Sequence, residues 1–260
     1  MNRWLRFLLI GLTGLVLLNS WLARTPSVNW QHPVQVYIYP VNADQSPVTQ
    51  AYIDQLHLEQ FSDIERFFQR EAARFHLSLA QPVHVHLAEQ PATNPPASPD
   101  HASMLDSVLW SLKMRWWVWR NALSAEESLS DVQIYMRFYA LGNPQAEQYV
   151  LGVQHGQVGL VNAYADAALQ GQSNLVAVHE LLHSLGASDK YDPETALPVW
   201  PDGYAEPTKQ PLLPQTRAEI MGGRVQISPS IALVPPGLEH VSLGSATAIE
   251  IGWLSIQNGQ

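Results

Sequence analysis

The sequence predicts an α+β domain in which a twisted mixed sheet is combined with long helices, and three observations support this fold class. Four short stretches alternate apolar and polar residues as half-buried strands do, and they lie within residues 34–39, 82–87, 131–139 and 158–163. Longer stretches repeat apolar residues at helical spacing, within residues 46–76, 102–123 and 173–185. The chain has 260 residues, which is enough for one or two domains with a sizeable core.

A hydrophobic helix is predicted to precede this domain. Arg3 and Arg6 come before 17 uncharged residues that run from Phe7 to Ala23, which is the lower limit for a transmembrane helix. A secretory signal peptide begins in the same way, but no Ala-x-Ala cleavage site follows. Residues 1–24 are therefore interpreted as a signal anchor or a signal peptide, and residues 25–260 as the folded domain.

The signal anchor is the favoured alternative. It would cross the inner membrane once through residues 7–23, with the basic start in the cytoplasm and residues 25–260 in the periplasm. Cleavage would instead give a secreted or periplasmic domain. The absence of cysteine agrees with an exported bacterial protein under either alternative.

Composition limits the classes of partner and of metal site. The net charge is −9, which argues against nucleic acid because phosphate binding needs clustered Lys and Arg. A chain without cysteine has no disulfides and no Cys-ligated zinc, so any strong metal ligands must be histidines and carboxylates.

The first half of the chain is predicted to supply the core of the sheet. The strand from Val34 is expected to end at Pro40, and one long helix is expected from Ser46-Pro47 to about residue 76, because proline suits the first helical turn. His84 and His86 lie on one face of the second strand. They form a conceivable metal pair, although histidines without a metal are the favoured interpretation.

A second long helix is predicted as an insertion near residues 102–125. Apolar side chains recur on one face, and Lys113 and Arg120 lie on the rest of the helix beside Trp117, which is expected to be exposed. Packing against the core is the favoured interpretation. The alternative is a basic, tryptophan-rich helix that lies in a membrane interface. The apolar face comprises Leu105, Leu109, Leu112, Trp116, Trp119 and Leu123.

The strongest functional signal lies in the helix predicted from Ser173 or Asn174, one of which would cap it, to the glycine at position 186, where helices commonly end. His179 and His183 are four residues apart, so they share one helix face and can bind a single Zn²⁺. Glu180 completes the HExxH pattern and can act as general base towards a metal-bound water.

These residues resemble the zinc-binding consensus HExxHxxGxxH of the metzincin metallopeptidases. The chain reads HExxHxxGxxD from His179 to Asp189, and aspartate in the third ligand position is similar to the variant of snapalysin-type enzymes. The stretch around Met221, Glu-Ile-Met-Gly-Gly, resembles the Met-turn beneath the metal in that clan. The similarity covers roughly residues 158–254.

The resemblance implies a metzincin-like zincin domain with one catalytic Zn²⁺. His179, His183 and Asp189 would be the ligands, Glu180 the general base, and a peptide or protein the substrate. The alternative function is a catalytically silent, zinc-stabilised binding module tethered to the membrane. Other acidic residues after the helix are open alternatives for the third ligand, namely Asp192, Glu194, Glu206 and Glu219.

The resemblance also implies where substrate would bind. The strand at residues 158–162 is expected to form the sheet edge that pairs with an extended substrate, which nominates Gly159 and Leu160. The proline-rich loop after Asp189 is expected to form one wall of the cleft, with Tyr191 and Tyr204 as lining residues.

Overall fold

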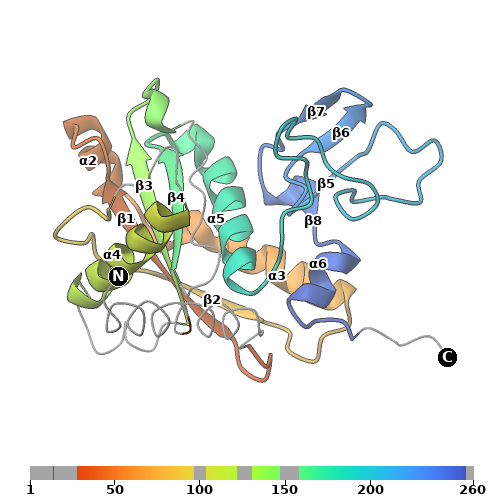
Figure 1. The fold of residues 1–260 in the computed structure, drawn as a ribbon, viewed down its shortest axis with the longest axis horizontal. Coiled ribbons are helices and arrows are strands. Elements are labelled where there is room, and N and C mark those ends of the chain that lie inside the picture. Colours follow the sequence, from red (N-terminus) through yellow and green to blue (C-terminus); the bar gives the residue numbers. More distant parts are fainter. Residues whose placement is uncertain (1–13, 15–27, 97–103, 122–130, 147–157, 256–260) are drawn as a thin grey trace, which may run out of the picture.

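The computed structural model describes residues 14, 28–96, 104–121, 131–146 and 158–255 (Figure 1). Apart from Gly14, the predicted hydrophobic segment at residues 7–23 lies outside these ranges. Within the described ranges, no helix is long and apolar enough to cross a membrane.

The described strands of the central sheet are all parallel. Their order is β2-β1-β3-β4, and each neighbouring pair runs in the same direction. The prediction of a mixed sheet is therefore wrong for this part of the chain, and the fold is α/β with a central parallel sheet and several helices. The strands are β1 (Val34–Asn42), β2 (Val83–Leu87), β3 (Val132–Tyr139) and β4 (Val158–Tyr164).

Strand β1 does not end at Pro40 but continues to Asn42. The carbonyl of Ile38 accepts a hydrogen bond from Ala88 N on the β2 side, so the backbone of Pro40, two residues later, faces the same side. Pairing with β2 extends only to Leu87, opposite Ile38. The N–H that proline lacks would therefore have no strand partner, which makes a proline tolerable here.

The predicted helix over residues 46–76 is divided into three helical segments. Ser46 caps the first, since its side chain accepts a hydrogen bond from Thr49 N. The break comes at His57, which is extended and whose N–H donates to the Gln60 side chain at 2.7 Å. That contact starts a new helical turn. The segments are α2 (Pro47–Ile53), η1 (Leu58–Phe61) and α3 (Ser62–Arg74).

Each face of the sheet is covered by different helices. One face packs against α3 and α5 (Gln170–Ser184) in the larger core, and the other packs against α4 (Met104–Asn121) in a smaller core. The orientation predicted for α4 is wrong. Trp117 is buried at 6% exposure, whereas Leu109, Leu112 and Trp116 are about half exposed. Trp117 packs edge-on against Tyr135 of β3, so the aromatic ring rather than the leucine face covers the sheet.

The C-terminal part of the domain lies to the right of α5 in Figure 1 and carries short strands and a helix. Two strands pair in parallel and two pair antiparallel. The last helix of the described chain stops before Ile251. The elements are β5 (Ala218–Glu219), β6 (Val225–Ser228), β7 (Ile231–Leu233), β8 (Val241–Ser242) and α6 (Ser245–Glu250).

Candidate metal centre

Helix α5 carries the HExxH residues and starts earlier than the sequence suggested. A short 3-10 turn at Ala167–Leu169 leads into it, and Asp166 caps that turn by accepting a hydrogen bond from Ala168 N. The prediction that Ser173 or Asn174 is the cap is therefore wrong, and both lie buried inside the helix. The predicted end is confirmed, because Gly186 has φ +104, a conformation that favours glycine.

Three potential metal ligands converge because the chain turns at Gly186. The Nε2 atoms of His179 and His183 lie 3.0 Å apart. Asp189 Oδ1 lies 3.1 Å from each of them. Tetrahedral Zn²⁺ with bonds of about 2.0–2.1 Å would hold its ligand atoms about 3.3 Å apart. The spacing of the three atoms thus fits a small metal ion.

The hydrogen bonds of the two imidazoles fix which nitrogen faces the cluster. His179 Nδ1 is 3.0 Å from the carbonyl of Ile220, and His183 Nδ1 is 2.9 Å from the carbonyl of Ala187. A carbonyl only accepts, so each Nδ1 must carry the proton. In the neutral rings both Nε2 atoms are then acceptors, and they face each other and a carboxylate. Three converging acceptors require a cation, either a proton or a metal.

Charge coupling inside the cluster follows the same geometry. Burial would raise the pKa of Asp189, but hydrogen bonds with His179 and His183 hold it well below its ordinary value. Burial would lower the pKa of His183, but the hydrogen bond with Asp189 and the charge of Glu180 raise it instead. Both shifts favour the charged pair of His183 and Asp189.

Glu180 lies at the same site. The potential ligand atoms of His179, Glu180 and His183 all lie within 4.8 Å of one another. These three residues could therefore bind a metal ion. Asp189 Oδ1 makes the closer approach to both imidazoles. In the part of the chain that the structure describes, no group donates a hydrogen bond to the Glu180 carboxylate. Burial raises the pKa of that carboxyl.

The turn at residues 219–222 supports the cluster. Met221 is fully buried, and its carbonyl accepts a hydrogen bond from Lys190 N at 3.0 Å. The preceding residue, Ile220, supplies the carbonyl that binds His179. The Glu219 carboxylate accepts hydrogen bonds from the backbone of Met221 and Gly222, so it fixes the shape of the turn.

Helix α6 holds the segment on both sides of Asp189. Glu250 accepts hydrogen bonds from Ser188 N and Oγ and from Lys190 Nζ, the last at 2.6 Å. Burial would raise the pKa of Glu250, but its bonds with Lys190 and Ser188 lower it. Neither Glu219 nor Glu250 was predicted as a supporting residue. The position of Glu219 directly before the Met-turn motif was the available signal for the first, and no sequence pattern marks the second.

The predicted substrate-binding residues differ in how close they lie to the metal ligands. β4 is the outermost strand of the sheet as described, and a Cβ on Gly159 would lie 3.4 Å from Glu180 Cβ. The Leu160 side chain is instead buried in the smaller core near α4. The ring of Tyr191 lies 6.5 Å from that of His179. Tyr204 contacts Ala218 and Pro201 through its backbone.

The other metal candidates from the sequence are accounted for by protein contacts. His84 pairs with Glu65 and Gln81, while His86 bonds to Gln35 and stacks on Tyr37. Among the alternative third ligands, the Glu219 carboxylate is held by backbone donors, and the carboxylates of Asp192 and Glu206 accept hydrogen bonds within the proline-rich loop. Glu194 contributes only its backbone N–H, which donates to Asp192. No family model matches the sequence, and no curated protein matches it at the threshold of significance.

Proposed function

We propose that this chain is a zinc-dependent endopeptidase of the metzincin type, in which His179, His183 and Asp189 hold one Zn²⁺. The observation that carries the proposal is the convergence of two Nε2 acceptors and one carboxylate oxygen within 3.1 Å. Such a donor set suits zinc, which prefers imidazole nitrogen and carboxylate oxygen in tetrahedral sites. A zinc ion bound there would supply Lewis acidity to a water molecule and to a substrate carbonyl.

The remaining chemistry belongs to the side chains. Glu180 is buried, carries no hydrogen bond from a described residue, and has a raised pKa. A carboxylate with these properties can accept a proton near neutral pH and return it to the leaving amine. The backbone contacts to Ile220 and Ala187 keep both imidazoles oriented during these steps, as outer contacts of metal ligands do.

The proposed substrate is a peptide in extended conformation. β4 is an outer strand of the described sheet, and Gly159 on that strand lies against Glu180. A substrate backbone paired with this edge would therefore pass beside the proposed base. Tyr191 flanks His179 and would contact the same substrate. The membrane anchor at residues 7–23 remains part of the proposal, with the catalytic domain outside the cytoplasm.

Cleavage of a peptide library by the purified full chain, with and without a chelator, tests this function. Glu180→Gln should keep the zinc and lower cleavage by at least about 100-fold, because a positioned general base contributes roughly 10²–10⁴. Glu194→Gln, an exposed loop glutamate, is the matched control and should retain full activity. A wild-type chain that binds zinc but cleaves no peptide would instead be a zinc-stabilised binding module.

A further inference from the structure

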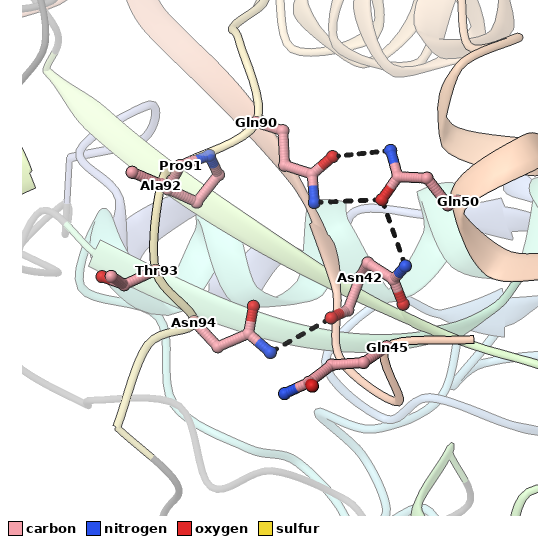
Figure 2. A pocket seen from close by; sticks show the side chains of 8 residues that line it. All are labelled: Asn42, Gln45, Gln50, Gln90, Pro91, Ala92, Thr93 and Asn94. Carbon is pink, nitrogen blue, oxygen red and sulfur yellow. Dashed lines mark hydrogen bonds between the residues drawn. The ribbon is translucent and has the colours of Figure 1, made fainter. Parts of the chain in front are cut away.

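A polar crevice of about 440 Å³ (Figure 2) has a lining that includes none of the candidate metal ligands. It is lined by residues from the end of β1, from α2 and from the loop that follows β2. Asn42 pairs in register with Phe138, and that residue pairs with Ala163. The crevice is thus at the carboxyl end of the strands, whereas Gly159 and the metal cluster are near the start of β4.

The topology marks this position as a ligand site. The chain leaves β1 towards α2 and α3 on one face of the sheet, and it leaves the adjacent β2 towards α4 on the other face. In open parallel sheets, neighbouring strands whose connections leave on opposite faces create a crevice between their carboxyl ends, and ligands bind there. A volume of about 440 Å³ is within the range of small-molecule sites.

The hydrogen bonds determine how the lining amides are oriented. Gln50 Nε2 donates to the Asp54 carboxylate at 2.8 Å, so Gln50 Oε1 must be an acceptor. Asn42 Nδ2 donates to that oxygen and to the carbonyl of Ser46, both at 3.1 Å. Both Asn42 amide hydrogens are thereby used. Its Oδ1 is buried and has no hydrogen-bond partner among the described residues.

Further side chains offer unused polar groups. Gln90 Oε1 accepts a hydrogen bond from Gln50 Nε2 at 3.0 Å, whereas Gln90 Nε2 reaches Gln50 Oε1 only at 3.5 Å, which is a weak bond (Figure 2). Gln45 is exposed and has φ +57, a conformation that costs energy for a side-chain residue and occurs at ligand sites. None of the residues that line the crevice is charged, so an ionic ligand has no counter-ion here.

The wall of the crevice opposite β1 is preorganised by two contacts. Trp117 Nε1 of α4 donates to Thr93 Oγ1 at 2.9 Å, and Asn94 Nδ2 donates to the carbonyl of Asn42 at 3.1 Å (Figure 2). The loop after β2 is therefore fixed to α4 on one side and to β1 on the other. A crevice that does not have to be ordered on binding retains more of its interaction energy as affinity.

We propose that this crevice binds a small neutral saccharide. A sugar hydroxyl both donates and accepts, so it can donate to Asn94 Oδ1, whose Nδ2 is already bonded to the Asn42 carbonyl, and accept from Gln90 Nε2. Several hydroxyls on one ring match several side-chain amides, each of which carries a donor and an acceptor. An extended peptide fits less well, because its recognition relies on sheet-edge backbone groups rather than on a ring of side-chain amides.

Saturation-transfer NMR with maltose and N,N′-diacetylchitobiose, on the full chain in a sugar-free detergent, tests the proposal. At least one sugar should bind with a dissociation constant on the order of 1 mM. Gln90→Ala should weaken binding about fivefold to tenfold, and Ala92→Trp, which fills the crevice from an exposed position, should abolish it. Gln55→Ala, an exposed glutamine outside the crevice, should bind as the wild type does.

Zinc content and unfolding temperature of each variant establish that it is folded. Two results would overturn the proposal: no transfer to either sugar at 20-fold above the expected ~1 mM constant, or equal transfer in Ala92→Trp and wild type. Binding of acetyl-trialanine amide without binding of either sugar would also overturn it, because the ligand would then be a peptide. None of these outcomes depends on whether the metal centre cleaves peptides.

Discussion

The buried carboxylate of Glu219 provides a quantitative prediction about how the metal centre is supported. Its two oxygens accept four hydrogen bonds, from Met221 N, Gly222 N, Gly244 N and Thr247 Oγ1, at 2.6, 2.8, 2.9 and 2.7 Å. In Glu219→Gln one accepting oxygen is replaced by an NH₂ group, which leaves two donors unpaired. At about 1.5 kcal/mol for each hydrogen bond to a charged group, the loss of stability is about 3 kcal/mol.

The same substitution should weaken zinc binding, because Glu219 shapes the turn whose Ile220 carbonyl orients His179. Loss of an outer contact of a metal ligand typically costs 10–100-fold in affinity. Urea unfolding of the metal-free protein measures the first effect, and competition with a chelator measures the second. Glu239→Gln is the matched control, since that side chain is 66% exposed, and it should change stability by less than about 0.5 kcal/mol. Equal behaviour of the two variants would refute the reasoning.

Three further predictions follow from burial, charge and backbone conformation. Trp117→Ala should destabilise the protein by about 3–5 kcal/mol, and Trp116→Ala by under about 0.5 kcal/mol. Chemical denaturation would measure both changes, and the reverse order would contradict the observed orientation of α4. Metal-free protein should lose stability as pH rises above 6.5, because the pKa of His183 is raised in the folded state. It should also lose stability as pH falls below 3.8, because the pKa of Asp189 is lowered in the folded state. Unfolding measured across pH in the presence of chelator checks both limits. Gly186→Ala should cost about 1 kcal/mol or more, because its φ is +104, and an unchanged melting temperature would be the contrary result.

Local sequence patterns predicted the helices and strands and the residues of the histidine cluster, but not the long-range contacts around them. The two histidines and Gly186 could be read from spacing alone, because one helix and its terminating glycine determine their relative positions. Trp117 could not be oriented in this way. A helix with apolar residues on several sides gives no clear periodicity, and tertiary contact with Tyr135 decided which side is buried.

Long-range contacts account for the other differences. Pro40 is tolerated in β1 because β2 is shorter, and the length of a neighbouring strand is not visible from the proline itself. Glu250 holds the segment around Asp189 from 62 residues away in sequence. The polar crevice is lined by both Asn42 and residues near position 90, which are far apart in the sequence. These relations depend on strand order, which local periodicity does not contain.

The zinc content of the purified full chain tests the central claim most directly. One zinc per chain is predicted for the wild type and for Asp192→Asn, whose carboxylate caps a loop turn. Asp189→Ala and His183→Ala should each lose most of it under the same dialysis conditions. Wild-type protein without zinc, or full zinc content in both ligand variants, would contradict the assignment of this cluster as a metal centre.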